Sequence, residues 1–597
     1  MSITETRERT PRQPLRLWPG VAAVVLQWLA RFGIKAVVPG FTGFAWSAQG
    51  GLIGAVAVVL WWLFFSRAAW VDRVGAIVLM VVAMGATWQL KHESMGPFWL
   101  VAYAIPVLCL AFVAWAVASR RLADGPRRAT MVATIVLACG AWTLARTEGI
   151  TGDHVATFSW RWAKTPEERA VAQAAGAPVA PAPVPSEASA AKEPPPMAPA
   201  VDVPGPLPTA TPARKTSAEW PGFRGARRDG TARGVRIATN WSASPPAPLW
   251  RRPVGPGWSS FAVHGDLFYT QEQRAGDEVV ACYKAASGQP VWTHRDRARF
   301  VESNAGVGPR ATPTLSHGRV YTFGATGILN ALDADDGAVV WSRNVTSESS
   351  AKVPYWGFSS SPLVVDDIVV VAAAAGQLLA YDLATGQPRW SGAAGEGYSS
   401  PHLATIDGVT QILQMSGAGV TSVAPADGRV LWQHGWKGGV PMVQPALTAE
   451  GDVLIVAGAA SGTRRLAVAN GPGGWTASER WTSLDLKPYF NDFVVHEGHA
   501  FGFDGRILAC IDLEDGTRKW KGGRYGNGQL VLLPDQDLLL VLSEDGELAL
   551  VQATPDQFTE LARVPAIEGK TWNHPVLVGD VVLVRNAEEM AAFRLPR

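Results

Sequence analysis

A glycine followed four residues later by a tryptophan recurs through the C-terminal part of this chain. The five segments are CYKAASGQPVW, ALDADDGAVVW, AYDLATGQPRW, SVAPADGRVLW and CIDLEDGTRKW, ending at Trp292, Trp341, Trp390, Trp432 and Trp520. Each has a small residue six positions before the glycine and an aliphatic residue eight before it. A period of roughly 40 to 50 residues, with alternating strands around a D-G or T-G turn, is typical of propeller blades. We expect the glycine to supply a positive φ and the tryptophan to pack between blades.

Further segments complete the blade count. A degenerate blade ends at Trp481, and another runs through LVLLPDQDLLLVLSEDGELALVQATPDQFTELARV. The final segment, PVLVGDVVLVRNAEEMAAFRL, provides only three strands, and we expect APLWRR around Trp250 to supply the fourth. Strands from both ends of the domain would then close an all-β, eight-bladed propeller without an exposed sheet edge.

The A-x-D-x-x-T-G-x-x-x-W pattern, best preserved as AYDLATGQPRW, resembles the pyrroloquinoline quinone (PQQ) enzyme repeat. That repeat occurs in quinoprotein dehydrogenases and in BamB-type scaffolds of outer-membrane assembly, and its glycine and tryptophan are structural in both. The resemblance covers roughly residues 250–597. The WPGFRGARRDG stretch at 220–230 resembles the lead-in of many bacterial PQQ-like propellers. The resemblance implies a PQQ/BamB-like propeller over residues 217–597.

Residues 1–150 are expected to form an α-helical bundle of about five transmembrane helices. The uncharged runs cover residues 17–30, 36–66, 74–90, 94–119 and 129–145. A helix needs about 20 apolar residues to span a bilayer. The first span, Val21–Val38, is ambiguous: Gln27, Arg31 and Lys35 form one polar stripe, so this helix either spans the membrane or lies in its interface.

The distribution of basic residues favours five spans and a cytoplasmic N-terminus. With five spans, Lys91 and Arg146 fall on one side, which leaves ten basic residues on the other, as the positive-inside rule requires. The ten are Arg7, Arg9, Arg12, Arg16, Arg67, Arg73, Arg120, Arg121, Arg127 and Arg128. Four spans would divide the basic residues almost evenly. We therefore expect a multi-pass protein of the bacterial inner membrane, with the lipid bilayer as a partner and the propeller in the periplasm.

Residues 151–216 are expected to form a disordered linker rich in proline and alanine. Twelve prolines fall between Val171 and Ala213, and the segment has few aromatic residues. Such a segment cannot bury a core, and at ~3.1 Å per residue it could extend over about 100 Å. The linker would let the propeller move far from the membrane.

Composition excludes several functional classes. The 53 Lys and Arg residues nearly balance the 51 Asp and Glu residues, so no nucleic-acid partner is expected. Cys109 and Cys139 lie in predicted spans, while Cys282 and Cys510 occupy the small-residue position of separate blades and are expected to be buried free thiols. The sequence contains no P-loop, no G-x-S-x-G motif and no GxGxxG after a strand.

Polar residues at the start of each inner strand mark the expected mouth of the central channel, where propeller ligands bind. The starts read GWSSF, GPRATP, GFSSSP, GYSSP, VQPAL, NDFVV, GNGQL and WNHPV. The residues expected at the axis are Ser260, Arg310, Ser360, Ser400, Gln444, Asn491, Asp492, Asn527, Asn573 and His574. The ligand candidates among them are Arg310, Ser360, Gln444, Asn491, Asn573 and His574. This ring would suit a polar or anionic small molecule or a peptide, although a water-filled channel would also make inner strands polar.

A quinoprotein, as the resemblance implies, would require PQQ with Ca²⁺ held by oxygen ligands and an aspartate as general base. Two carboxylate and amide pairs lie near the predicted axis: Asp492 with Asn491, and Glu302 with Asn304. Asp492 is the catalytic candidate under this alternative. The adjacent cysteine pair of PQQ alcohol dehydrogenases is not present in the sequence.

Two further groups of residues are candidate sites. The lead-in has a basic cluster, which we expect to be a solvated loop in preference to a site for lipid headgroups or acidic polymers. Its members are Arg224, Arg227, Arg228, Arg233 and Arg236. His496 and His499 are expected to flank a hairpin turn in preference to binding zinc.

Two functions follow from the sequence. The first is an inner-membrane-anchored periplasmic propeller that acts as a BamB-like binding or scaffold module for envelope proteins or a polar axial ligand, with no cofactor required. It differs from BamB-type scaffolds because no lipidated N-terminal cysteine is present. The alternative is a membrane-bound PQQ-dependent dehydrogenase that oxidises an alcohol or sugar and passes electrons to ubiquinone. A membrane domain before a PQQ-type propeller resembles membrane glucose dehydrogenase, but the short interblade loops leave little material to cover a cofactor.

Overall fold

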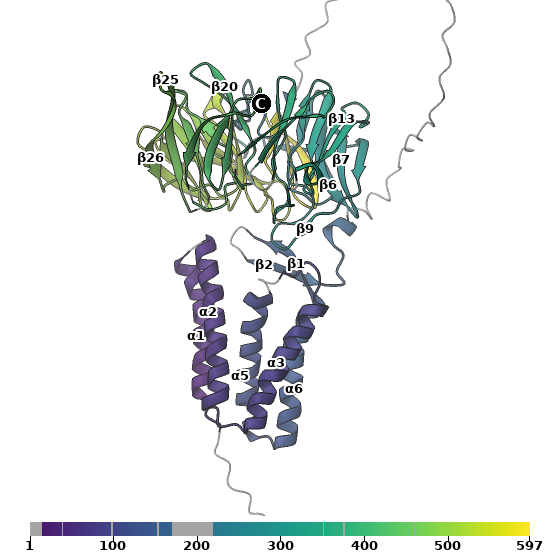
Figure 1. The fold of residues 1–597 in the computed structure, drawn as a ribbon, viewed down its shortest axis with the longest axis vertical. Coiled ribbons are helices and arrows are strands. Elements are labelled where there is room, and N and C mark those ends of the chain that lie inside the picture. The colour runs from purple at the N-terminus through teal and green to yellow at the C-terminus, as the bar shows by residue number, and fades with distance from the viewer. Residues whose placement is uncertain are drawn as a thin grey trace, which may run out of the picture.

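The structure is a computed structural model with a helical part and a β-propeller beyond one end of the helices (Figure 1). It describes residues 15–38, 40–96, 100–151, 155–169, 219–349, 351–373, 377–393, 395–436, 438–458 and 460–597. Most of the predicted linker, residues 170–216, lies outside the described residues.

Five α-helices make up the described part of the membrane domain. They are α1 (Trp18–Val37), α2 (Gly40–Leu60), α3 (Trp70–Leu90), α5 (Ile105–Ala118) and α6 (Asp124–Gly140), with shorter turns η1 (Trp61–Phe65), η2 (Leu100–Ala104), η3 (Ser119–Arg121) and η4 (Ala141–Leu144). Among the described residues, three helical segments are long and apolar enough to cross a membrane: Gly43–Phe65, Trp70–Leu90 and Ala102–Arg121. The predicted count of about five spans is therefore not confirmed.

Gln27 and Arg31 of the polar stripe of α1 pack against neighbouring helical segments, while the Lys35 side chain lies outside the described residues. Gln27 is 1% exposed, and its side-chain amide donates to the carbonyl of Gly51 at 2.7 Å. Arg31, one turn further, is 7% exposed, and its guanidinium lies 4.4 Å from the ring centre of Tyr103. These two residues therefore face the interior of the bundle.

The described part of residues 219–597 folds into eight antiparallel sheets arranged as propeller blades (Figure 1). Blades 1 to 4 contain β5 (Ala262–His264), β6 (Leu267–Arg274), β7 (Asp277–Lys284) and β8 (Pro290–Asp296); β11 (Thr314–Ser316), β12 (Arg319–Phe323), β13 (Ile328–Asp333) and β14 (Val339–Asn344); β15 (Leu363–Val365), β16 (Ile368–Ala373), β17 (Gln377–Asp382) and β18 (Pro388–Ala393); and β19 (His402–Ile406), β20 (Val409–Ser416), β21 (Gly419–Val423) and β22 (Val430–Gly435).

Blades 5 to 8 follow the same order from the inner strand outwards. They contain β23 (Ala446–Leu447), β24 (Val453–Ile455), β25 (Thr463–Gly471) and β26 (Gly474–Ser483); β27 (Val494–His496), β28 (His499–Asp504), β29 (Ile507–Asp512) and β30 (Arg518–Arg524); β31 (Gln529–Leu533), β32 (Leu538–Leu542), β33 (Glu547–Gln552) and β34 (Glu560–Pro565); and β35 (Val576–Val578), β36 (Val581–Arg585), β37 (Glu589–Arg594) and β4 (Ala247–Pro253). Smaller elements are β3 (Glu219–Trp220), β9 (Val301–Glu302), β10 (Gly306–Val307), α8 (Val345–Ser349) and η5 (Pro534–Gln536).

Ring closure follows the prediction. The outer strand of blade 8 is β4, which pairs antiparallel with β37 and places Trp250 opposite Ala592. Strands from the two ends of the domain therefore share one sheet, and this pairing covers the edge that three strands alone would leave open.

The register of the blades explains the repeat. Within a blade, the small residue pairs directly opposite the tryptophan of the outer strand, as Ala331 does with Trp341. The indole then reaches the next blade, where it donates to the carbonyl of Leu383 at 3.1 Å and packs under Gly386. Gly386 has a φ of +70°, and a Cβ there would lie 2.5 Å from the Trp341 ring. The glycine is thus required both by the turn and by the interblade contact.

The propeller docks on the helical part through one face. This face carries the connections that lead into inner strands, because it includes residues just before β11 and β35. It meets the hairpin of β1 (Ala145–Ile150) and β2 (Ala156–Trp160), which follows the helices. In an antiparallel four-stranded blade, the turn after the inner strand and the glycine-tryptophan turn lie on the opposite face, which we call the outward face.

Specific contacts hold the two parts together. The Ile150 amide donates to the Asn304 carbonyl at 2.7 Å, and the Arg299 guanidinium pairs with both carboxylate oxygens of Glu167 at 3.0 Å. Trp572 packs into an apolar cluster with Phe44, Ile150, Tyr103 and Ala156. In this structure the described residues on either side of the linker are in contact, whereas the sequence predicts a linker that lets the propeller move far from the membrane.

Candidate axial site

The lead-in at residues 220–230 fills the propeller axis from the outward face. β3 adds Trp220 to the inner edge of blade 1, where it pairs with Val263, and Thr231 forms a bridge with Leu532 on blade 7. Between these anchors Arg224 and Arg228 adopt φ values of 59° and 54°, in the left-handed region that arginine rarely occupies. The tight loop turns both guanidinium groups inward, where their exposure is 3% and 7%.

Arg228 bonds to blades 3 and 5 at once. Its guanidinium donates to the carbonyls of Pro362 at 2.9 Å and Ser361 at 3.1 Å, and its Nε donates to Gln444 Oε1 at 3.3 Å. The Gln444 amide returns a bond to the Arg228 carbonyl at 2.7 Å and lies 2.8 Å from His402 Nδ1 on blade 4. Burial, followed by the charge of Arg224, lowers the pKa of Arg228 to about 9, so it is still a cation at neutral pH.

Asp492 is the anion of this cluster. Its Oδ1 lies 3.6 Å from Arg224 Nη1 and accepts the backbone N–H of Gln444 at 3.1 Å, and its Oδ2 lies 3.2 Å from His574 Nε2. Burial works to raise the pKa of Asp492, but Arg224 and His574 hold it below its ordinary value, so the carboxylate is ionised. Burial lowers the pKa of His574, which is therefore neutral at pH 7 and donates to the carboxylate.

His402 completes the set as a neutral ring. Its burial, followed by the charges of Arg228 and Arg224, lowers its pKa to about 3. The axial cluster therefore carries two arginine cations, one aspartate anion and two neutral imidazoles. Carbonyl oxygens at the starts of the inner strands compensate the remaining positive charge, because they accept from both guanidinium groups.

The structure brings together three of the predicted axial residues, namely Gln444, Asp492 and His574. Two asparagines lie beside them. Asn573 donates to the Ser259 carbonyl at 2.7 Å, while Asn491 accepts the Tyr489 amide at 2.9 Å. Among the described residues, Asn491 Nδ2 and Asn573 Oδ1 have no hydrogen-bond partner, so this end of the axis keeps one donor and one acceptor for water or a small polar ligand.

The remaining ring residues join blades or loops. Ser360 Oγ accepts the Ala372 amide of its own blade at 3.0 Å, Ser400 Oγ accepts the Ser361 amide at 2.9 Å, and Ser260 Oγ donates to the His574 carbonyl at 2.6 Å. Asn527 donates through its backbone amide to Glu544 at 3.0 Å.

Arg310 lies apart from the Asp492 cluster, in the loop that meets the helical part. It pairs with Glu302 at 3.2 Å and donates to the carbonyls of Gly306 and Gly308 at 2.8 and 2.6 Å. Burial lowers its pKa, although Glu302 opposes that shift. Its present contacts stabilise the loop of β9 and β10.

Neither carboxylate pair fits a Ca²⁺ ion. Calcium takes six or more oxygen ligands, several of them anionic. Both oxygens of Asp492 already accept hydrogen bonds or face cations, and Arg224 and Arg228 make the surroundings positive. Both oxygens of Glu302 accept backbone amides at 2.6 Å, and Arg310 neutralises its charge. Asp492 is therefore placed to hold the lead-in, and the structure does not present it as a free base.

The docked mouth of the propeller carries aromatic rings and one lysine. Lys570 lies 4.4 Å from the ring centre of Trp572 and 5.2 Å from that of Trp258, and its Nζ donates to the Ile150 carbonyl at 2.9 Å. Burial lowers the pKa of Lys570 to about 8, against the opposing charges of Glu544 and Glu302. The hairpin after the helices thus covers this end of the axis.

One possible metal-binding set occurs among the described residues. His496, Glu497 and Asp537 bring ligand atoms within 4.8 Å of one another at the turns of blades 6 and 7. His496 pairs with His499 across the β27 and β28 hairpin, as expected, and its Nε2 lies 2.8 Å from Asp537 Oδ1. Two of the three groups are exposed, and the histidine is already bonded to a carboxylate.

Sequence reasoning missed Arg224, Arg228 and His402. The prediction of a solvated lead-in is wrong for Arg224 and Arg228, while Arg227, Arg233 and Arg236 are exposed as expected. Two glycines at positive φ follow the buried arginines closely, Gly225 directly after Arg224 and Gly230 two residues after Arg228, and this G-x-x-x-x-G spacing within the lead-in was the available signal.

The geometry defines an eight-bladed β-propeller whose own N-terminal lead-in closes the axis. A family model described as "Outer membrane protein assembly factor BamB" matches residues 239–412, 276–522 and 416–596, which together span more than half of the chain. The chain therefore belongs to the BamB family of PQQ-repeat propellers.

Several individual proteins are similar to parts of this chain. BamB of Yersinia pestis is 23% identical over 320 residues, covering 51% of this chain and 70% of that protein. BamB of Shewanella oneidensis is 32% identical over 112 residues, covering 18% of this chain and 26% of that protein. BamB from Moraxella catarrhalis aligns with a TM-score of 0.43 at 14% identity, over 59% of this chain and 98% of that one. Quinohemoprotein alcohol dehydrogenase from Comamonas testosteroni aligns with a TM-score of 0.46 at 13% identity, over 64% and 82%.

Proposed function

We propose that this protein is a periplasmic binding or scaffold module, held at the bacterial inner membrane as a multi-pass protein by its N-terminal helices. Family membership supports a BamB-like role, and the apolar helices together with the bias of basic residues support the membrane placement. On this proposal the partners are the bilayer and envelope proteins.

The observation that carries the scaffold proposal is the closed axis. The lead-in enters from the outward face and bonds through Arg224 and Arg228 to residues at the starts of the inner strands, and the β1 and β2 hairpin covers the docked end through Ile150 and Lys570. The surfaces available to a partner are therefore the turns of the outward face and the outer strands of the blades. The glycine-tryptophan turns present neutral exposed side chains such as Gln289 and Gln387.

Site-directed photocrosslinking in cells tests this role. A photoreactive amino acid replaces Gln289 or Gln387 on the outward face, and Tyr355, which is 61% exposed in a connection of the docked face, is the matched control. We expect the same envelope protein to be crosslinked from both outward positions and not from Tyr355. Absence of any adduct from both positions, or equal adducts from Tyr355, contradicts the proposal.

A second experiment separates the scaffold from the dehydrogenase alternative. Purified full-length chain is mixed with PQQ and Ca²⁺, desalted, and assayed for quinone absorbance and for dye reduction by alcohols or sugars. We expect no stoichiometric retention, because neither Asp492 nor Glu302 has a free oxygen for calcium. Retained quinone with turnover would overturn the scaffold proposal.

The membrane placement has its own test. Alkaline phosphatase fused after Arg597 is active only in the periplasm, and a fluorescent protein fused there folds only in the cytoplasm. We expect phosphatase activity in the membrane fraction. Cytoplasmic fluorescence alone would refute the topology without bearing on the fold.

A further inference from the structure

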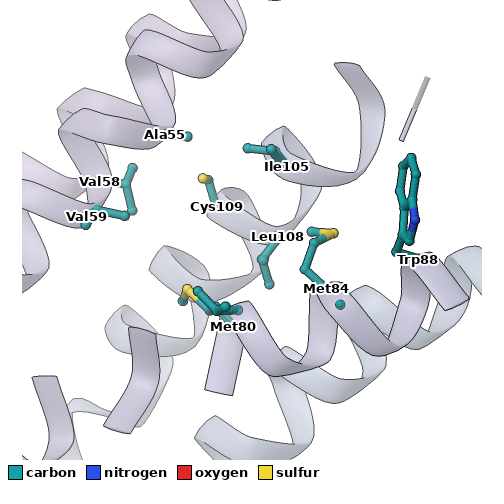
Figure 2. Close-up of a pocket in the computed structure, with 11 residues that line it drawn as sticks. Ala55, Val58, Val59, Met80, Met84, Trp88, Ile105, Leu108 and Cys109 are labelled. Atoms are coloured by element: carbon teal, nitrogen blue, oxygen red, sulfur yellow. The ribbon is translucent and has the colours of Figure 1, made fainter. Parts of the chain in front are cut away.

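An apolar cavity of about 450 Å³ lies between three helices of the membrane domain (Figure 2). Its walls come from α2, α3 and α5, and the lining residues are Ala55, Val58, Val59, Met80, Val81, Met84, Gly85, Trp88, Ile105, Leu108 and Cys109. Two methionine sulfurs, one thiol and one indole nitrogen are the polar or polarisable atoms that these side chains contain. Water in such a cavity would lack hydrogen-bond partners, so an apolar occupant is favoured.

The α3 wall of the cavity borders open space. Its lining residues recur at spacings of one and four, so they share one face of the helix. A Cβ at Gly85 would meet nothing within 4 Å. α3 packs against α6, but only 11% of its span is buried within the protein. On the cavity face, Val81 and Trp88 are 68% and 41% exposed, whereas Met80 and Met84 pack partly against the core of the bundle, so this face is only partly packed.

The size of the cavity matches one hydrocarbon chain. A water molecule occupies ~30 Å³ and a methylene is of similar size, so the space holds roughly 15 such groups, or one long acyl chain. A transmembrane helix does not fit. With a diameter of ~10 Å and a length of ~30 Å, it would need about five times this volume.

The cavity has a polar neighbour at one end. Trp88, near the C-terminus of α3, lines it, and Lys91 Nζ lies 5.0 Å from the Trp88 ring centre. Tryptophan and lysine at the end of an apolar helix are typical of the membrane interface, where lipid phosphates lie. An amphipathic molecule with an apolar chain and an anionic head would place the chain in the cavity and the head beside Lys91.

We infer that this cavity binds one acyl chain of a membrane phospholipid, with the phosphate at the level of Lys91. The inference rests on the proposed membrane placement of the helices. The lipid fills the gap between the α2 and α5 wall and the α3 and α6 pair, and so completes the bundle. Dispersion contacts with the methionines and leucine, together with removal of apolar surface, supply the affinity.

Lipid retention by the full-length chain tests this site. The wild type is reconstituted in vesicles of phosphatidylethanolamine and phosphatidylglycerol, extracted into detergent, washed, and analysed by native mass spectrometry. Gly85→Phe and Ala55→Phe fill the cavity from opposite walls. Gly75→Phe is the matched control, because Gly75 also lies on α3 with open space around its Cβ but does not line the cavity.

We expect about one retained phospholipid per wild-type chain and per Gly75→Phe chain, and about tenfold less in both filled variants. An acyl-chain diazirine should also label the Met84 and Cys109 segments in the wild type and lose this labelling in the filled variants. Equal retention in all four proteins overturns the inference, as does a second protein chain whose binding is lost in the filled variants. A chain found in the membrane fraction but without retained lipid refutes this site alone, whereas a chain absent from that fraction refutes the membrane placement.

Discussion

Replacement of Arg228 by alanine tests whether the lead-in seals the propeller axis. The change removes three hydrogen bonds, to Pro362, Ser361 and Gln444. It leaves the Ser361 carbonyl and Gln444 Oε1 without a donor, whereas the Pro362 carbonyl still accepts from the Thr314 hydroxyl at 2.6 Å. An unpaired buried acceptor costs about 1–3 kcal/mol, and the space left by the side chain adds to this. Some of the cost is offset because the buried cation itself disappears. We expect a net destabilisation of about 3–5 kcal/mol.

The matched control is Arg227→Ala, one residue earlier, where the side chain is exposed. An exposed arginine away from such bonds contributes within about 0.5 kcal/mol. Thermal unfolding of the full-length chain in detergent, followed by tryptophan fluorescence, compares the two variants. At about 2.1 cal/mol/K per residue, a propeller of this size unfolds with an entropy near 0.8 kcal/mol/K, so Arg228→Ala should lower Tm by about 4–6 °C. An equal Tm for Arg228→Ala and Arg227→Ala would refute the sealed axis.

Three other predictions concern blade packing, titration and docking. Trp341→Phe keeps most of the apolar contact but loses the interblade hydrogen bond, so denaturant unfolding should show a loss of about 1–2 kcal/mol. Burial raises the pKa of Glu278 from 4.5 to about 7, so the stability that this group contributes below pH 4.5 is lost as the pH rises through 7. Relative to Glu278→Gln, the wild type should lose about 2–3 kcal/mol of unfolding free energy between pH 5 and pH 8. Parallel curves of unfolding free energy against pH for the two proteins would contradict this. Arg299→Glu should speed hydrogen exchange at the Ile150 amide, because it breaks the ion pair with Glu167. The double variant Arg299→Glu with Glu167→Arg should restore slow exchange. Fast exchange at this amide already in the wild type would show that the docked contact does not form.

The blades could be predicted from the sequence because their signals are local. The glycine and tryptophan of one repeat fix a turn and a contact with the adjacent blade, and the small residue at Ala331 is required by the indole directly opposite it. The closure by Trp250 could be predicted from the count of strands, since three strands without a fourth leave an edge. Cys282 and Cys510 are buried free thiols, as their position opposite Trp292 and Trp520 requires.

The axial cluster could not be predicted because its partners are distant in sequence. Arg228 meets residues 133 to 216 positions away, and the Phe493 carbonyl that Arg224 reaches lies 269 positions away. A run of arginines between glycines has the composition of a solvated loop, and its burial depends on an aspartate and carbonyls that only the closed ring brings together. The sequence shows that the starts of the inner strands are polar, but it does not show which groups form hydrogen bonds with them.

The closed axis also imposes a free-energy cost on any ligand that would bind there. Such a ligand has to displace Arg228 or separate the hairpin from Lys570, and displacing Arg228 breaks three hydrogen bonds that the folded protein already has. At about 1 kcal/mol net for each, the intrinsic affinity would be reduced by about two orders of magnitude before any contact is gained. A protein that binds the outward turns meets no such cost, because those turns are already ordered by the indole contacts beneath them. The physical chemistry of the axis thus favours partner binding at the outward face over small-molecule chemistry inside the ring.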